Sequence, residues 1–458
     1  MKQRLLVTAI ALTLCSNWAQ AGTLLDAWRA AQQHDPEYAA AQAAHGAGAT
    51  RRDQARSLWR PNVQLTGSVA YMGNETTTDG AQFAAPDVGF SKTENVSFNT
   101  SITHGTATDW ALSARQPLIN RERLAQSRQL DLAADAADLQ WQDAQQALIL
   151  RTAQRYYDVV LASATLDVLQ RQQTAVDKTL TEVEDRFKLG DVPVTDTHEA
   201  RARAQGISAQ VLAAQSDLQM RDVALADLTG LSTKDLQPQA PSATTVADLP
   251  ALDTALSSTQ SNNPMLRLQQ VNLASSREEV AKHSPVGSTS LDLVAQIGRE
   301  RLSGSGDFGD ASNSANKRMI GVQLTIPLFT GGYRSARQEE SLRLADKAQA
   351  DLELTRQQVA QQTRAAWLGL TVGAQRIAAL EQARTASQSR LDATRVGHGV
   401  GHRTTLDLLN AENDAAQAEL TVLQARVTYL MDQLRLAALE GQLNEQTLEM
   451  LSASHSKP

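Results

Sequence analysis

The sequence predicts a mainly α-helical fold with a membrane β part, built as two tandem structural repeats that each contain two long helical struts and a β-hairpin. Three observations favour this fold class. Local patterns occur twice along the chain, long segments lack glycine and proline, and short segments alternate between apolar and polar residues. The composition agrees, because only 4% of the residues are aromatic and helix-favouring residue types dominate.

The duplication is visible in the spacing of prolines and glycines. A shared period of about 210 residues indicates a duplicated structural unit rather than a solenoid of short repeats. We expect a first repeat over residues 22–231 and a second over 251–441. The recurring positions are Pro117 and Pro327, offset by 210 residues, and the pairs Gly190 and Gly401, and Gly230 and Gly441, each offset by 211.

Residues 1–21 are expected to be a secretory signal peptide. A charged start precedes the apolar run from Leu5 to Leu14, and Ala19-Gln20-Ala21 is a small-residue cleavage site. Cys15, the single cysteine, lies in this segment, and Leu14 stands where a lipoprotein signal needs a small residue. The mature chain would therefore have neither a lipid anchor nor a disulfide.

Each repeat is expected to contain three helical segments, and the longest is the most informative. Residues 120–189 contain no glycine or proline, and seventy helical residues would form a rod about 105 Å long. A heptad seam along its lower part indicates coiled-coil packing. The predicted helices are 24–58, 120–189 and 195–229 in the first repeat, and 252–282, 331–396 and 404–439 in the second.

Period-two alternation predicts the membrane strands. About ten alternating residues suffice to cross a bilayer as a tilted strand. Pro117 and Pro327 are expected to end sheet pairing at the strand-to-helix junctions, and residues 72–106 and 299–316 are expected to be loops, although alternation within 96–102 would extend the first hairpin. The predicted strands are 62–72 and 107–117, then 290–298 and 318–328.

Two remaining segments are expected to surround the middle of the rods. Residues 232–250 link the repeats, and 442–458 form a C-terminal tail. The returning helices end halfway up the rods, so both segments would form an equatorial belt.

Four strands cannot close a barrel, and lipid does not tolerate an open sheet edge. Several chains must therefore share one barrel. Two chains would give eight strands, whose interior is filled by side chains, whereas three would give twelve. The sequence thus favours a trimer.

The whole mature chain resembles the TolC family of outer-membrane channel-tunnel proteins. The motifs that carry this resemblance are Phe187-Lys-Leu-Gly190 with Thr195-Asp196, the segment from Val400 to Ala411, the two proline junctions, and Leu443 to Leu448. The resemblance implies a homotrimer whose twelve-stranded barrel continues into an α-helical barrel. It also implies a constricted periplasmic entrance, opened when a periplasmic adaptor and an inner-membrane transporter, either ATP-driven or proton-driven, dock.

The resemblance implies a gate at the ends of the rods. Asp407 matches a constriction residue, Arg403 matches an arginine that ties neighbouring coils together, and Thr195 and Asp196 match a linking pair. From the residues alone, Asp196 and Asp407 are either carboxylates that cap or favour a helix N-terminus or members of an acidic ring that selects cations.

Two positions depart from the family pattern. Asn410 stands where a second constriction aspartate is expected, which removes three charges from a trimeric ring. His398 replaces a tyrosine, and we favour a plain substitution over a pH-sensitive latch. The residues of the turns, Gly190, Pro193, Gly397 and Gly401, are expected to contact the adaptor.

Other chemistries are not supported. His398 and His402 have metal-ligand spacing, but glycines at 397, 399 and 401 are expected to break any helix there. The chain is acidic, with a net charge of −7, which disfavours nucleic acid as a partner. Because no catalytic motif is found, we expect neither an enzyme nor a cofactor.

The resulting prediction is an outer-membrane exit duct of a Gram-negative bacterium, with a long periplasmic extension. It would carry small molecules or proteins from the periplasmic side to the exterior, as part of a tripartite efflux pump or a type I secretion system. The alternative is a periplasmic coiled-coil scaffold or adaptor without a membrane barrel. The four alternating strands distinguish the two, because a soluble coiled coil does not need them.

Overall fold

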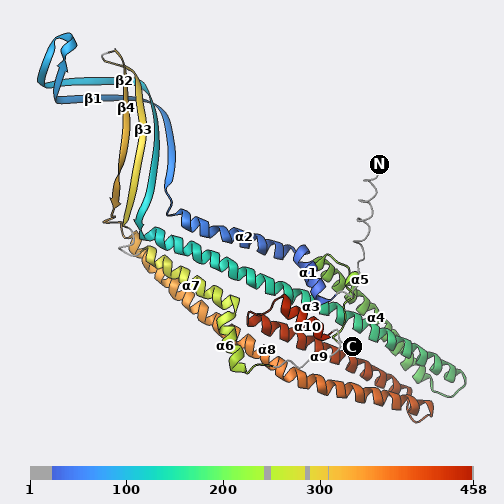
Figure 1. Ribbon diagram of the computed structural model, residues 1–458. Coiled ribbons are helices and arrows are strands. Elements are labelled where there is room, and N and C mark those ends of the chain that lie inside the picture. Colours follow the sequence, from blue (N-terminus) through green and yellow to red (C-terminus); the bar gives the residue numbers. More distant parts are fainter. Residues whose placement is uncertain (1–22, 242–248, 284–288, 308, 456–458) are drawn as a thin grey trace, which may run out of the picture. The chain divides into compact units, whose positions relative to one another are not determined.

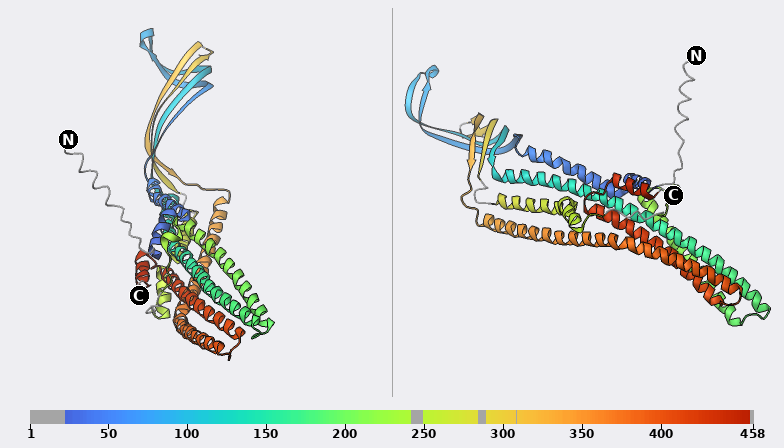
Figure 2. Two further views of the ribbon diagram at one scale, coloured as in Figure 1. Left: turned by 90° about the vertical axis from the view of Figure 1, so that its right-hand side faces the viewer. Right: turned by 60° about the horizontal axis from the view of Figure 1, so that its bottom comes forward.

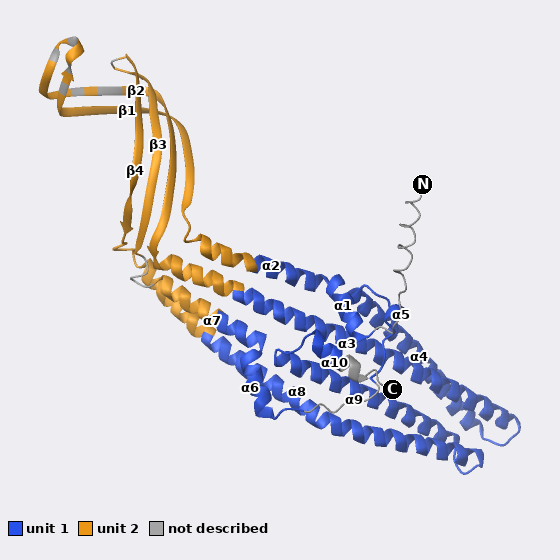
Figure 3. Cartoon of the chain, viewed as in Figure 1, with its two compact units in different colours: residues 1–48, 135–271, 349–458 blue, residues 49–134, 272–348 orange. Residues whose placement is uncertain are grey.

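The computed structural model describes residues 23–455 apart from 242–248, 284–288 and 308. The expected signal peptide lies outside the described residues. The chain divides into two compact units (Figure 3). The larger unit comprises Met1–Gly48, Asp135–Val271 and Gln349–Pro458, and the smaller comprises Ala49–Ala134 and Asn272–Ala348.

The described residues form a mainly helical chain with one four-stranded sheet (Figure 1), which confirms the predicted combination of helical and β parts. The helices are α1 (Leu24–His34), α2 (Pro36–Ser57), α3 (Arg121–Lys188), α4 (Val194–Thr229), α5 (Thr233–Leu236), α6 (Leu252–Asn262), α7 (Pro264–Lys282), α8 (Tyr333–Gly399), α9 (Thr405–Leu439) and α10 (Glu445–His455). The strands are β1 (Asn62–Ala85), β2 (Phe90–Asn120), β3 (Ser290–Gly306) and β4 (Gly309–Thr325), and a short 3-10 helix spans Pro86–Val88.

The opening helix of each repeat is broken once, which corrects the single helices predicted over 24–58 and 252–282. Asp35 and Asn263 are extended, with ψ of 117° and 122°, because a residue before proline avoids the helical region. The side chain of each then caps the following helix. Asp35 Oδ1 accepts the Glu37 N–H at 3.1 Å, and Asn263 Oδ1 accepts the Leu266 N–H at 3.1 Å.

The long helices α3 and α8 pair with the returning helices α4 and α9 as antiparallel hairpins (Figure 1, Figure 2). The heptad positions of the first hairpin pack as the sequence predicts. Val176 on α3 and Ile207 on α4 are 1% and 2% exposed, and they share a cluster with Leu409 of α9. A repeating apolar seam therefore joins the two hairpins near their turns.

Two glycines allow α8 and α9 to approach closely. A Cβ atom built on Gly373 would lie 2.9 Å from Cδ2 of Tyr429, and one on Gly369 would lie 2.6 Å from Oδ2 of Asp432. A side chain at Gly373 would have to displace the Tyr429 ring, whereas at Gly369 the Asp432 carboxylate would have to rotate away. The seam of the second repeat therefore depends on small residues as well as apolar ones.

The largest apolar cluster lies where α1, α5 and α10 pack on the long helices. Polar contacts also fix the linker and the tail to the helices. Arg29 pairs with Glu445 at 2.8 Å, the Gln239 N–H donates to the Tyr156 hydroxyl at 3.0 Å, and Trp367 Nε1 donates to the Pro250 carbonyl at 2.9 Å. The equatorial belt itself stays a prediction.

The four strands pair antiparallel in the order β1-β2-β3-β4. They are longer than predicted. Residues 72–106 and 299–316 are mostly strand, because the Thr- and Ser-rich stretches continue the ladder, so the predicted loops are wrong and the suggested extension of the first hairpin is correct.

Pro117 does not end sheet pairing, which corrects a second prediction. β1 begins at Asn62, opposite Arg115, so among the described strands Pro117 pairs only with β3, and its missing N–H disrupts no ladder with β1. A register shift before Ile119 then carries the strand on to Asn120, whose Oδ1 accepts the Arg123 N–H at 2.9 Å and caps α3. β4, in contrast, ends at Thr325, two residues before Pro327.

The sheet has one apolar face and one polar face over its helix-proximal half. Val63, Leu65 and Ile320 share the apolar face and are 63–78% exposed in the single chain. Residues such as Gln64, Ser113 and Gln296 occupy the opposite face. The outer edges of the sheet, along β1 and β4, have no partner strand among the described residues.

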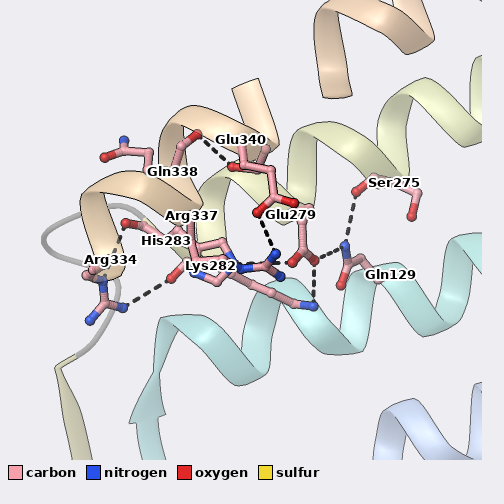
Figure 4. Close-up of polar contacts among 10 residues, drawn as sticks. Gln129, Ser275, Glu279, Lys282, His283, Arg334, Arg337, Gln338 and Glu340 are labelled. Carbon is pink, nitrogen blue, oxygen red and sulfur yellow. Dashed lines mark hydrogen bonds and ion pairs between the residues drawn. The ribbon is translucent and has the colours of Figure 1, made fainter. Parts of the chain in front are cut away.

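A polar network joins α3, α7 and α8 next to the sheet in the smaller unit (Figure 4). Glu279 Oε2 accepts hydrogen bonds from Lys282 Nζ at 2.8 Å and from Gln129 Nε2 at 2.9 Å. Arg334 donates to the carbonyl oxygens of Lys282 and His283. Burial raises the pKa of Glu279, but the hydrogen bonds from Lys282, Gln129 and His283 outweigh burial and lower that pKa to about 2.

Candidate functional site

Both helical hairpins turn through the same backbone geometry. Gly190 and Gly401 each have φ +79°, a conformation that glycine adopts without strain. The Gly190 N–H donates to the Phe187 carbonyl at 3.0 Å, and the Gly401 N–H donates to the His398 carbonyl at 3.0 Å. The duplication seen in the sequence therefore extends to individual hydrogen bonds.

His398 lies in the last turn of α8, which ends at Gly399, so the helix breaks within the glycine-containing segment before it reaches His402. Its side chain is buried, with Nε2 3.5 Å from Thr405 Oγ1. His402 lies in the turn and is exposed. No group of three potential ligands that could hold a metal occurs in the part of the chain that the structure describes.

Asp407 caps its own helix. Thr404 is the N-cap residue of α9, and its Oγ1 accepts the Asp407 N–H at 3.1 Å, while Asp407 Oδ2 accepts the Thr404 N–H at 3.1 Å. This reciprocal pair is a capping box. The hydrogen bonds from Thr404, together with the charge of Arg403, lower the pKa of Asp407, so the carboxylate stays ionised at neutral pH.

Asp196 occupies the equivalent position in the first repeat but has no such cap. Pro193 stands where the second repeat has Thr404, and it offers no hydroxyl to α4. Thr195 Oγ1 donates a hydrogen bond to Asp196 Oδ1 at 3.4 Å. Thr195 is exposed and Asp196 is half-buried. The two aspartates that the sequence treats alike therefore differ in how firmly their side chains are held.

Arg403 packs its aliphatic stem against the end of α8. A Cβ atom on Gly397 would lie 2.8 Å from Cγ of Arg403, so only glycine leaves room for this side chain. Within the described residues of one chain, no carboxylate lies within 4 Å of the guanidinium. Its charge acts on Asp407 without a direct ion pair.

Asn410 is exposed and lines a groove of about 400 Å³ between α4 and α9. Leu406 and Leu409 share its side of the groove, and Glu199 and Arg203 come from α4. The structure thus brings Asn410 close to the first repeat. In the described part of one chain, neither Asp196 nor Arg403 lines that groove.

Sequence reasoning missed Glu412, one turn beyond Leu408. Its side chain is only 8% exposed, with Arg395 Nη2 3.4 Å from Oε1, and Oε2 has no hydrogen-bond partner among the described residues. Burial raises the pKa of Glu412, against the opposing effect of Arg395. The signal was present in the pattern of α9, because Glu412 lies four residues after Leu408 on its buried face.

Known proteins share this architecture. The family model "outer membrane efflux protein" matches residues 28–231 and 255–442, which include both hairpin turns and both pairs of strands. The chain belongs to the outer membrane efflux protein family. This is a family of outer-membrane channels and not of enzymes.

Curated relatives of this family member span nearly its whole length. Outer membrane protein TolC of Escherichia coli strain K12 is 26% identical over 475 residues, covering 100% of this chain and 90% of the relative. The proteases secretion protein PrtF of Dickeya chrysanthemi is 26% identical over 460 residues, covering 99% and 95%.

Solved structures show the same fold. The outer membrane protein VceC of Vibrio cholerae superposes with a TM-score of 0.71 at 18% identity, covering 91% of this chain and 96% of that chain. The Campylobacter jejuni CmeC outer membrane channel gives 0.71 at 16% identity, covering 94% and 89%. These likenesses confirm the predicted fold class. Across residues 23–455, outside the undescribed gaps, none of the helices has the length and hydropathy needed to cross a membrane.

Proposed function

We propose that this chain is one subunit of a homotrimeric outer-membrane exit duct with a gated periplasmic entrance. The observation that carries the proposal is the four-stranded sheet. One of its faces is apolar over the helix-proximal half, and its β1 and β4 edges are unpaired. In lipid such edges must pair, so β1 of one copy would join β4 of the next.

Three copies give the best closure. The sheet contributes four strands per chain, so two copies would make an eight-stranded barrel whose interior side chains fill. Three copies make a twelve-stranded barrel with room for a conduit. The polar face then lines the lumen and the apolar face contacts lipid.

The periplasmic gate is proposed at the ends of the helical hairpins. Asp196 and Asp407 would contribute six carboxylates per trimer, and Asn410 leaves the ring three charges short of the family pattern. Among the described residues, Arg403 forms no ion pair within its own chain, so it is available to bind a neighbouring coil and hold the entrance closed.

The names of the relatives support the proposed partners. Their names include a protease secretion protein and an outer membrane efflux protein, BepC of Brucella suis. We propose that the turns at Gly190, Pro193, Gly397 and Gly401 contact a periplasmic adaptor that bridges to an inner-membrane transporter. Substrate choice would then lie with the transporter.

Planar-bilayer recording tests the gate. The purified protein is expected to form cation-preferring channels of low conductance, and Arg403→Ser is expected to raise the conductance because the tie between coils is lost. Arg201→Ser is the matched control, since the Arg201–Glu184 pair at 2.7 Å lies within one hairpin. Equal conductance in both variants would remove Arg403 from the gate, and absence of any channel would refute the duct.

A further inference from the structure

The β1–β2 hairpin continues well beyond the β3–β4 hairpin. Pairing between β2 and β3 ends at His104 and Ser305, whereas β1 and β2 remain paired from Asn74 and Ile102 to Ala85 and Phe90. We call residues 74–102 the strap. Within the described part of the chain, its strands pair only with each other, so the strap is free to leave the curve of the sheet.

A bulge bends the hairpin at the base of the strap. Met72 pairs with Gly105 and Asn74 with Ile102, so Gly73 alone faces two residues of β2. A Cβ atom on Gly73 would lie 2.6 Å from the Thr103 carbonyl oxygen, so no other residue fits there. Bulges of this kind bend strands. Figure 1 and Figure 2 show the hairpin turning away from the direction of the sheet at this level.

The geometry fixes the direction of the bend. Strand alternation puts Gly105, Ala107 and Leu302 on the same face as the polar residues Asp109 and Glu300. A Cβ atom on Gly105 would lie 2.9 Å from Cγ2 of Ile102 and 3.1 Å from Cδ1 of Leu302. Ile102 therefore lies over the polar face.

A small apolar cluster holds the strap in that position. Ile102, Ala107 and Leu302 are each 6–7% exposed, although the surrounding face is polar. Because one member comes from the strap and two from the sheet, the cluster joins the strap to this face.

The strap is also negatively charged. It contains four carboxylates and one lysine, a net charge of −3 per chain. Three carboxylates accept hydrogen bonds from neutral side chains, which orient them without cancelling their charge. Asn99 donates to Glu75 at 3.0 Å, Ser97 to Asp79 at 2.7 Å and Gln82 to Glu94 at 3.4 Å; Lys92 lies 3.9 Å from Glu94.

We propose that the strap is a second selectivity element, which narrows the outer mouth of the duct and favours the passage of cations. This inference rests on the proposed function, because the polar face lines a lumen only in a closed barrel. Three straps would then lean inward over one opening, at the end of the strands far from the helices. Rings of carboxylates at such a constriction attract cations and repel anions.

A deletion tests the constriction. Residues 73–104 are replaced by Asn-Gly, which suits a two-residue turn between the paired residues Met72 and Gly105. Recordings are made in the Arg403→Ser background, so that the periplasmic gate does not limit the current. We expect conductance to rise roughly twofold or more and the preference for cations to fall.

Two point variants separate anchoring from charge. Ile102→Asp should release the strap and raise conductance, whereas Thr77→Asp adds the same charge at an exposed strap position and should not. The triple variant Glu75→Gln, Asp79→Asn, Glu94→Gln should lower cation preference at unchanged conductance.

The outcomes distinguish the two proposals. If the parent forms channels but the deletion changes neither conductance nor selectivity, the strap proposal is overturned while the duct stands. If the parent itself forms no channel, the proposed function fails instead.

Discussion

Asp407 is bound to the first turn of its own helix, so its structural role and its electrostatic role have to be separated by substitution. The capping box with Thr404 explains why this aspartate stays ionised and ordered. Asp196 has the same place in the first repeat without a capping hydroxyl. The comparison between the repeats therefore supplies an internal control.

The first prediction separates the cap from the charge. Thr404→Ala removes the capping hydroxyl and keeps the carboxylate, so helix stability should fall by about 1 kcal/mol while ion selectivity is retained. Asp407→Asn removes the charge and should lower cation preference in bilayers. If thermal unfolding shows the loss for Thr404→Ala but Asp407→Asn leaves selectivity unchanged, Asp407 is only a cap.

Asp196→Asn completes this comparison. It breaks no cap, so its unfolding midpoint should match the parent, and a fall in cation preference would come from charge alone.

At the scale of elements, the position of each helix depends on a few close or charged contacts. The α8–α9 seam relies on Gly369 and Gly373, and the helix ends beside the sheet rely on the network around Glu279. Both features bring together residues that are distant in sequence.

The second prediction concerns the close approach of α8 and α9. Gly373→Leu places a side chain against Tyr429, whose Cδ2 lies only 2.9 Å from the Cβ position, and should destabilise the fold by about 1–3 kcal/mol. Gly206→Leu in α4 is the control, because its Cβ would meet open space, and it should raise stability by about 0.5–1 kcal/mol. Denaturation in detergent compares them, and equal effects would exclude the steric explanation.

The third prediction concerns the pH dependence of the network at Glu279. Its pKa is lowered from 4.5 to about 2, so the stabilisation is complete above pH 4.5 and is lost as pH falls toward 2. Glu279→Gln should destabilise the protein at pH 7 by about 1–2 kcal/mol, with a smaller loss at pH 3.

The control for this variant is Glu340→Gln, which breaks the exposed Arg337–Glu340 pair within α8 and should have little effect. Thermal midpoints measured between pH 3 and pH 7 provide the comparison. A penalty for Glu279→Gln that stays constant across this range would contradict the assigned network.

Long segments without glycine or proline predicted the long helices well. Features that depend on tertiary contacts were not predictable from the sequence. The expected rod over 120–189 corresponds to α3 over Arg121–Lys188, because glycine and proline are absent there. The prediction that Pro117 ends sheet pairing was wrong, because the residue of β2 at which pairing with β1 begins is set by strand pairing and not by the local sequence. The burial of His398 beside Thr405 was likewise not readable from the local sequence.

The candidate site shows the same division. The turning glycines and the aspartates that follow them are readable from the duplicated sequence. The residues left open whether Asp407 caps its helix or belongs to an acidic ring. The hydrogen bond from the Asp407 N–H to Thr404 Oγ1 shows the cap, and the acidic ring stays a proposal. Glu412 and the strap anchor at Ile102 required the packing of residues that lie far apart in the chain.

At the scale of the whole molecule, the account depends on copies of this chain completing one another's sheet. The apolar residues of the helix-proximal half of the sheet are exposed in a single chain, and the edges of β1 and β4 have hydrogen-bonding groups with no partner strand among the described residues. Water disfavours the exposed apolar face, and lipid disfavours the unpaired edges, so both features are satisfied only in a closed barrel within the membrane.

The mass of the purified protein in mild detergent, determined by native mass spectrometry, tests this claim most directly. We predict an assembly of three chains that persists on dilution, because every β1 and β4 edge must pair and a barrel of two chains would leave no conduit. A protein that is monomeric under these conditions, yet retains the β-sheet signal in circular dichroism, would contradict the account.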